Sequence, residues 1–249
     1  MSTAAAPSVD PAEVERFARL AEAWWDPGGK FRPLHVLNPV RLGFIRETAI
    51  AHFGLDPKAR RALSGLSVLD VGCGGGLVAE PLARLGAEVT AIDAAERNIA
   101  IAEAHAAQSG VAVDYRVASA EDLAAEERQF DIVLALEIVE HVAHLAAFMD
   151  AASALVKPGG LIILATLNRT AKAFALAIVG AEWVLGWLPR GTHDWRKFVR
   201  PSELARELRR NGMALAEIRG VIYSPLSDRW ALSTDTDVNY MVTAKKPVG

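Results

Sequence analysis

The sequence predicts an α/β fold in which helices cover both faces of a mostly parallel sheet. Short apolar runs alternate with helical patterns between residues 67 and 168, which is typical of parallel strands joined by crossover helices. A glycine-rich stretch, SVLDVGCGGGLVAEPL (67–82), includes the first of these runs. The 249 residues are 51% hydrophobic and 23% charged, a composition that supports a folded chain with a substantial core.

Two helices are expected ahead of this alternation. Asp10 and Pro11 fit the N-cap and first position of a helix, because proline needs no hydrogen bond there. The segment WWDPGGKFRPLH ends that helix, and a second is expected to follow Asn38-Pro39. Both helices belong to an N-terminal helical cap.

Seven strands are expected, and the last two form an antiparallel, hairpin-like edge of the sheet. A turn-rich segment separates these two strands. The expected strands are 68–71, 88–93, 113–118, 130–136, 161–168, 215–223 and 238–246, and the expected helices within the alternation and after it are 77–85, 95–109, 144–156 and 201–211.

We expect a single domain over residues 1–249. A segment inserted after the fifth strand would lie at the ligand-binding edge of such a sheet, so we expect it to act as a lid. The expected parts are a loose tail (1–9), the N-terminal helical cap (10–62), a cofactor-binding core (63–168), the inserted lid (169–200) and the C-terminal part of the core (201–249).

The glycine-rich loop follows the first strand, where an open α/β sheet binds its ligand. A dinucleotide fingerprint would need a third glycine where the chain has Leu77, and a P-loop would need a lysine and a hydroxyl residue after Gly76. The pattern present is Asp70-x-Gly72-x-Gly74-x-Gly76. This pattern resembles the first motif of class I S-adenosylmethionine-dependent methyltransferases, and the resemblance implies their Rossmann-like fold and their cofactor.

The acidic residues around the loop suit that cofactor, which has no phosphate but carries a cationic amine and a sulfonium. Asp93 ends the second strand, where a carboxylate can accept both ribose hydroxyls. Asp122 follows the third strand, where this family commonly places an acid near the adenine amino group; the alternative is a surface acid in the first turn of a helix. Leu136 ends the fourth strand and would line the path to the methyl group.

The segment EIVEH (137–141) follows the fourth strand at the expected catalytic edge. If it enters a helical turn, Glu137, Glu140 and His141 share one face and could hold Mg²⁺ or another divalent cation. A metal would favour the phenolate of an acceptor whose pKa is near ~10. Two alternatives stay open: His141 acts as a general base without a metal, or the acids complement a helix start while His141 packs.

Further motifs extend from about Glu13 to Lys246: RFARLAEAWWDPGGKFRPLHVLNPVRLGFI, EIVEHV, TLNRT, VGAEW, GTHDWRKF and DVNYM. With the glycine loop, they resemble the ubiquinone-biosynthesis O-methyltransferases, the 3-demethylubiquinol 3-O-methyltransferase / 2-polyprenyl-6-hydroxyphenol methylase family. The resemblance implies methylation of phenolic hydroxyls on polyprenylated ubiquinone precursors. Two reactions are implied: 3-demethylubiquinol to ubiquinol, and 2-polyprenyl-6-hydroxyphenol to 2-methoxy-6-polyprenylphenol.

The same resemblance assigns roles to residues. Arg41, Gly72, Asp93 and Leu136 match the family's cofactor-contacting positions, and Arg41 could pair with the methionine carboxylate because a guanidinium binds it bidentately. Glu137, Glu140 and His141 match its proposed metal positions. Relatives often carry methionine where this chain has Leu136, a change that preserves an apolar, shape-filling role.

One segment, KAFALAIVGAEWVLGWLPR (172–190), is almost entirely apolar but too short to span a membrane. Trp183 and Trp187 lie one helical turn apart, and basic residues flank the segment, as in a helix at a membrane surface. We expect the lid to dip into the membrane surface and admit an insoluble tail; the alternative is an ordinary buried helix.

Composition and charge narrow the function further. The net charge of −3 gives no reason to expect nucleic-acid binding. The single cysteine, Cys73, excludes an internal disulfide and suits a reducing compartment. We therefore expect a cytoplasmic protein, with a peripheral position on the inner face of the cytoplasmic membrane and contacts with other ubiquinone-biosynthesis proteins as further hypotheses.

Three alternatives to this function stay open at this point. The first is a methyltransferase of the same fold acting on another small or lipophilic phenol. The second is a non-catalytic, cofactor-binding assembly protein, for which the EIVEH segment would have no use. The third is a nicotinamide oxidoreductase, which Leu77 disfavours.

Overall fold

The structure is a computed structural model that describes residues 8–176, 178 and 194–248. Its strands form one sheet of eight, in the order β3-β2-β1-β4-β5-β8-β6-β7. The first five are parallel, and the remaining pairs are antiparallel. The strands are β1 (Ser67–Val71), β2 (Glu88–Asp93), β3 (Asp114–Val117), β4 (Phe130–Leu136), β5 (Val156–Leu167), β6 (Ala214–Ser224), β7 (Arg229–Ser233) and β8 (Asn239–Lys245).

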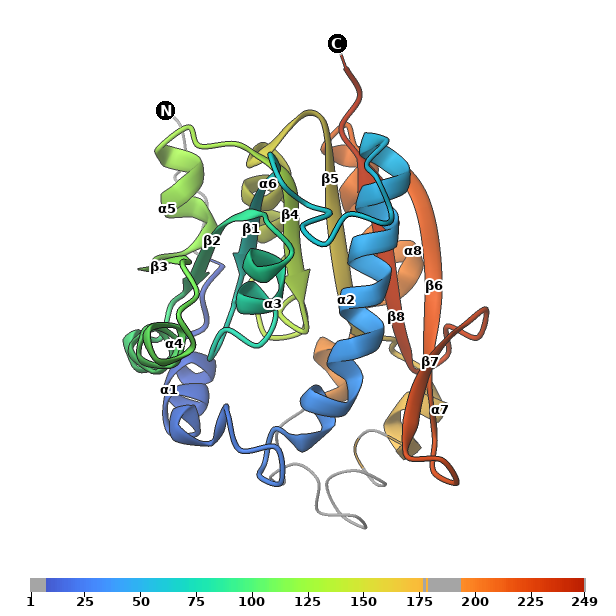
Figure 1. The fold of residues 1–249 in the computed structure, drawn as a ribbon. Helices are drawn as coiled ribbons and strands as arrows, with labels where there is room; N and C mark the ends of the chain where they lie inside the picture. The colour runs from blue at the N-terminus through green and yellow to red at the C-terminus, as the bar shows by residue number, and fades with distance from the viewer. Residues whose placement is uncertain (1–7, 177, 179–193, 249) are drawn as a thin grey trace, which may run out of the picture.

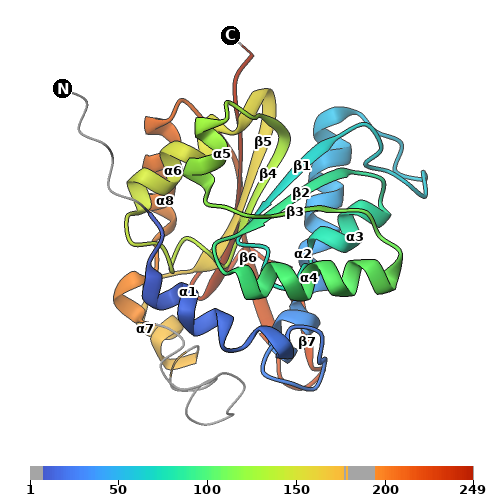
Figure 2. The ribbon, with the colours of Figure 1, turned by 90° about the vertical axis from the view of Figure 1, so that its left-hand side faces the viewer.

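Helices cover both faces of this sheet (Figures 1 and 2), with α2, α3 and α4 on one face and α5, α6 and α8 on the other. The short helix α1 lies at the end of the sheet where the parallel strands finish. The α-helices are α1 (Pro11–Ala18), α2 (Arg32–Phe53), α3 (Ala79–Arg84), α4 (Glu96–Ser109), α5 (Ala120–Ala125), α6 (Leu145–Ala154), α7 (Ala171–Ala173) and α8 (Pro201–Arg210), and two 3₁₀ turns are η1 (Ala21–Ala23) and η3 (Trp195–Lys197).

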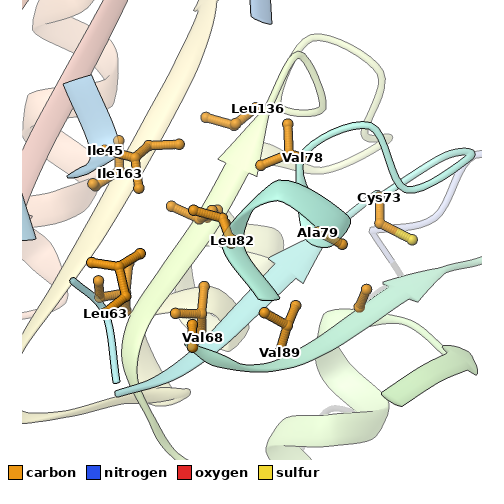
Figure 3. Close-up of a cluster of buried hydrophobic side chains, with 14 of the residues drawn as sticks. Ile45, Leu63, Val68, Cys73, Val78, Ala79, Leu82, Val89, Leu136 and Ile163 are labelled. Atoms are coloured by element: carbon orange, nitrogen blue, oxygen red, sulfur yellow. The ribbon is translucent and has the colours of Figure 1, made fainter. Parts of the chain in front are cut away.

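Two apolar clusters hold these layers together. In the first, Val68 and Ile163 of the sheet pack against Ile45 of α2 and Leu82 of α3 (Figure 3). The second cluster joins the opposite face of the sheet to α5, α6 and α8. Strands buried on both faces are expected to be apolar throughout, which explains why FDIVLAL and LIILATL could be recognised as strands.

The predicted fold class is confirmed, but the sheet has eight strands where seven were expected. The additional strand, β7, lies in the turn-rich segment, where residues 229–233 pair with the end of β6. The last strand, β8, inserts between β5 and β6 and is antiparallel to both. The two late strands are therefore neighbours, as predicted, although a strand separates them along the chain.

Two local expectations were wrong. The helix expected after Asn38-Pro39 begins earlier, at Arg32, because Pro33 takes a position in its first turn. Pro39 lies inside this helix, where its fixed φ is tolerated at the expense of one backbone hydrogen bond. Strand β5 begins at Val156 rather than at residue 161, so the KPGG sequence is part of the strand.

Within the described ranges, no helix is long and apolar enough to cross a membrane. Most of the segment 172–190, including Trp183 and Trp187, lies outside the described residues. The membrane contact predicted for that segment, and the lid that contains it, stay predictions.

Candidate active site

The glycine loop is held in place by the carboxylate that ends β2. Asp93 Oδ2 accepts a hydrogen bond from the Gly74 backbone N–H at 2.9 Å, and Oδ1 accepts one from Ala95 at 2.8 Å. Gly74 has φ +54° and a Cβ there would lie 2.3 Å from the Trp24 ring, so this position requires glycine. Burial raises the pKa of Asp93, against the hydrogen bonds that it accepts.

The N-terminal cap closes the outer side of this loop. The Trp24 indole donates to Asn98 Oδ1 at 3.0 Å and stacks on Phe31, with ring centroids 3.8 Å apart. Leu77, the residue that replaces a third glycine, packs in the same apolar cluster. Trp25 Nε1 donates to the Gly75 carbonyl at 2.8 Å. A side chain at position 77 therefore anchors the cap, which is why glycine is not needed there.

A pair of opposite charges, of which the Arg41 side chain is buried, lies beside the loop. Arg41 reaches in from α2, and its Nη2 is 3.1 Å from Glu137 Oε1. Within the described part of the chain, Arg41 Nε and Asp70 Oδ2 are buried without a hydrogen-bond partner. Burial, opposed by the Arg41 charge and reinforced by Asp93, raises the pKa of Asp70 to about 7. Such unsatisfied buried groups indicate a missing polar ligand.

These residues line one cavity of about 970 Å³. At one end it is polar, with Arg41, Asp70 and Asp93 beside Gly72 and Gly74. Elsewhere its lining is mostly apolar and comes from α1, from Leu176 just after α7 and from the β6–β7 segment: Val14, Phe17, Leu176, Val221, Ile222, Tyr223 and Trp230. Leu136 lies on the wall of the cavity, as expected from its place at the end of β4.

The EIVEH segment does not form the helical turn on which the predicted metal face depended. It is an irregular turn, and Glu137 has φ +56°, an uncommon conformation for a residue with a Cβ and one often found at functional sites. Glu137 pairs with Arg41. Glu140 is buried and accepts a hydrogen bond from Thr166 Oγ1 at 2.7 Å. The two acids are therefore held by different partners.

His141 is held by the N-terminal helix. Its Nδ1 lies 3.2 Å from Glu13 Oε2, and its ring contacts Phe17 edge-on at 5.1 Å. Burial alone would raise the pKa of Glu13, but His141, Arg16 and Lys197 hold it below its ordinary value. His141 and Glu13 both line the cavity. A carboxylate paired with one imidazole nitrogen is an arrangement that orients a general base.

The present arrangement does not fit a divalent cation. No group of three or more His, Cys, Asp and Glu side chains in the described ranges is placed to hold a metal ion. Burial and the nearby Glu137 charge raise the pKa of Glu140 to about 8. We derive no step through a metal from these positions.

Two further residues considered in the sequence, Asp122 and Cys73, lie in different surroundings. Asp122 completes the capping box of α5, whose N-cap is Ser119: its Oδ2 accepts from the Ser119 backbone N–H at 2.8 Å. Ser119, Ala120 and Glu121 line the cavity, whereas Asp122 is not among its described lining residues. This geometry favours the helix-turn alternative for Asp122. Burial raises the pKa of the Cys73 thiol, which makes it unreactive.

Sequence reasoning missed three residues of this site: Glu13, Trp24 and Asn98. Glu13 and Trp24 contact residues far away in the sequence, His141 and Asn98 respectively. Asn98 in turn donates to Asp93 Oδ1, five residues earlier. The unusual WW pair after a helix (24–25) was the only local signal, since two adjacent tryptophans must be covered by apolar surface.

Comparison with known proteins gives a consistent result. Residues 45–218 match a family described as a methyltransferase domain. A ubiquinone biosynthesis O-methyltransferase of Methylobacterium sp. (strain 4-46) is 56% identical over 99% of both chains. The protein of the same name from Maricaulis maris (strain MCS10) is 57% identical over 98% of this chain and 95% of that one.

Solved structures support the fold. The magnesium protoporphyrin IX methyltransferase of Synechocystis PCC 6803 with bound SAH superposes with a TM-score of 0.66 at 18% identity, over 95% of this chain and 100% of that chain. At this level of identity the similarity concerns the fold alone.

Proposed function

The chain belongs to the ubiquinone biosynthesis O-methyltransferases, and we propose that its acceptors are the two polyprenylated phenols of that pathway. These are 3-demethylubiquinol, converted to ubiquinol, and 2-polyprenyl-6-hydroxyphenol, converted to 2-methoxy-6-polyprenylphenol. The supporting observation is a single cavity whose polar end suits an amino-acid nucleoside and whose other end is apolar. An S-adenosylmethionine-dependent O-methyltransferase of ubiquinone synthesis requires both.

The polar end has the groups that the cofactor requires. The Arg41 guanidinium would hold its carboxylate, and the unpartnered Asp70 Oδ2 would accept from its ammonium group. Asp93 would accept from the ribose hydroxyls while it keeps the loop in place through Gly74. When bound, S-adenosylmethionine supplies an electrophilic methyl group on its sulfonium. The fixed loop and charges contribute mainly by positioning the reactants.

At the apolar end, His141 would accept the proton of the acceptor hydroxyl. A phenol with pKa near ~10 is a weak nucleophile at neutral pH, and a positioned imidazole can take its proton as the new bond forms. Glu13 keeps the His141 Nδ1 engaged and stabilises the imidazolium that results. Leu136 lines the cavity between the two ends.

Metal assistance, the other sequence-based hypothesis, would require Glu137, Glu140 and His141 to gather around one ion. In the described structure they are held by three different residues, Arg41, Thr166 and Glu13. We therefore expect the rate of methyl transfer to survive dialysis against EDTA. A loss of activity that Mg²⁺ restores would overturn the general-base assignment and show that these side chains rearrange around a metal.

Acceptor choice tests the proposed function. Initial rates are measured with short-tailed 3-demethylubiquinol, with 2-prenyl-6-hydroxyphenol and with an unprenylated catechol. We expect both prenylated acceptors to be methylated and preferred in kcat/KM. A preference for the unprenylated catechol would instead indicate a methyltransferase for another phenol.

The proposed lid and its membrane contact have a separate test. Liposome co-sedimentation compares the wild-type protein with the double variant Trp183→Glu/Trp187→Glu. We expect the variant to lose binding because charge replaces both aromatic anchors. Equal binding by the two proteins would remove the membrane role of residues 172–190 and leave only the lid.

A further inference from the structure

The additional strand β7 forms the edge of the sheet that lies farthest from β3. Strand β6 runs in the same direction as β5, because both are antiparallel to β8. Its C-terminal end therefore lies at the same end of the sheet as the glycine loop. The last residues of β6 pair with β7 from Gly220 to Ser224, and this hairpin projects at that end (Figure 1). We call residues 220–233 the β6–β7 hairpin.

Exposed apolar side chains gather at this hairpin and just after α7. Leu226, at the hairpin tip, is fully exposed. Leu176 and Ile222 are exposed and also line the cavity, so apolar surface continues from the inside of the cavity to the outside. Among the described residues, five of the seven exposed large hydrophobic side chains lie here: Phe174, Leu176, Ile222, Leu226 and Leu232.

Polar contacts fix the hairpin in this position. The Tyr223 hydroxyl donates to Asp228 Oδ1 at 2.6 Å, and Arg32 at the start of α2 pairs with the same carboxylate. Lys172 of α7 pairs with Asp235, which follows β7, and both residues line the cavity. An exposed apolar edge strand promotes aggregation unless it has a use. A fixed, apolar edge next to a cavity mouth indicates such a use.

The size of the cavity limits what it can enclose. Pockets of roughly 300–1,000 Å³ usually hold one drug-sized ligand, and the cavity of about 970 Å³ must hold both the cofactor and the acceptor ring. A tail of many isoprene units cannot be enclosed as well, so it must leave through an opening. Among the described residues, Leu176 and Ile222 line the cavity and also reach the surface, so an apolar way out lies beside them.

We propose that the β6–β7 hairpin is the exit path of the isoprenoid tail, which lies along Ile222 and Leu226 as it leaves the cavity. This inference rests on the proposed function, because it takes the acceptor to be prenylated. It assigns acceptor specificity to a strand outside the seven that were expected.

The experiment compares two acceptors with the same 3-demethylubiquinol ring in detergent micelles, one with a single isoprene unit and one with many. The variant Leu226→Ser removes an exposed side chain that is absent from the cavity lining. We expect kcat/KM for the long-tailed acceptor to fall about tenfold and that for the short-tailed acceptor to stay unchanged. The control Val117→Ser alters an exposed apolar residue on β3, at the opposite edge, and should change neither.

Other outcomes overturn the inference. An equal fall for both acceptors would mean that the variant damages the site as a whole, and no change for either would mean that the tail does not touch the hairpin. Weaker binding to lipid vesicles with an unchanged ratio in micelles would identify the hairpin as a contact to the bilayer. If the wild-type protein methylates neither acceptor, the proposed function itself fails, a result distinct from these.

Discussion

The cofactor end of the cavity is built mainly from strand ends, whereas the acceptor end is built from segments far apart in the sequence. Asp70 and Asp93 finish neighbouring parallel strands, so the sheet register places them together. At the acceptor end, His141 meets Glu13 across 128 residues of sequence, and the β6–β7 hairpin comes from the last part of the chain. This difference indicates that the common fold determines the methyl donor, whereas the added segments determine the acceptor.

The largest effect should come from the acceptor end. His141→Gln should lower kcat by about 10²–10⁴-fold, the usual contribution of a general base, and leave the Kd for S-adenosylhomocysteine unchanged. Steady-state kinetics and calorimetry measure the two quantities. Glu140→Gln is the matched control, because Glu140 is held by Thr166 and is not among the described residues that line the cavity; a comparable loss in this control would contradict the separation of roles.

At the cofactor end, we expect a substitution to change the Kd for S-adenosylhomocysteine. Asp93→Ala removes the acceptor of the Gly74 and Ala95 N–H groups and the proposed ribose contact. Loss of such charge-assisted hydrogen bonds should weaken S-adenosylhomocysteine binding by about 10²-fold. Calorimetric titration checks this, and an unchanged Kd would show that Asp93 serves the loop in some other way.

Asp70 should make the affinity for S-adenosylhomocysteine depend on pH. Its pKa of about 7 means that the carboxylate needed for the cofactor's ammonium group forms as the pH rises. Affinity for S-adenosylhomocysteine should therefore increase about tenfold from about pH 6 to about pH 8, and Asp70→Asn should abolish this increase. A pH-independent Kd in the wild-type protein would contradict the role given to Asp70.

The stability of the cofactor-free protein should follow the opposite trend. A carboxyl whose pKa is raised on folding contributes stability that is present below its unfolded pKa and lost as the pH rises through the folded value. Asp70 and Glu140 should thus each contribute a fall in Tm as the pH rises from about pH 4 to about pH 8. Differential scanning calorimetry measures it, and Asp70→Asn should remove only part of the fall.

The smallest effect is expected at Asp122, where it distinguishes a helix-capping role from a contact with adenine. Asp122→Ala should cost about 1 kcal/mol of stability, the usual value of a lost helix cap, with the Kd for S-adenosylhomocysteine unchanged. Chemical denaturation and calorimetry provide the two numbers. A weaker Kd without loss of stability would restore the adenine contact suggested by the sequence.

What the sequence could predict follows the same division. Asp70, Gly72, Gly74 and Asp93 could be placed because they depend on strand ends and local backbone freedom. The arrangement of Glu137, Glu140 and His141 could not, because a positive φ at Glu137 turns the chain away from the helical spacing that the motif suggested. Tertiary partners such as Arg41 and Thr166, rather than local preference, decide where those side chains lie.

The contacts of the N-terminal cap and the strand at the edge of the sheet were harder to predict from the sequence, for a related reason. Trp24 closes the glycine loop through a contact with Asn98, a pairing that no periodic pattern in one sequence reveals. Strand β7 is short and follows Pro225 and Asp228, residues typical of turns, so its pairing with β6 becomes visible only in the assembled sheet.

Transfer of an isotopically labelled methyl group tests the central claim most directly. The protein is incubated with methyl-labelled S-adenosylmethionine and short-tailed 3-demethylubiquinol, and the products are analysed by mass spectrometry. We expect labelled O-methyl quinol in equal amount to S-adenosylhomocysteine, and much less of both with His141→Gln. Binding of S-adenosylhomocysteine without a labelled product from either phenol, in a protein with a normal Tm, would contradict the account.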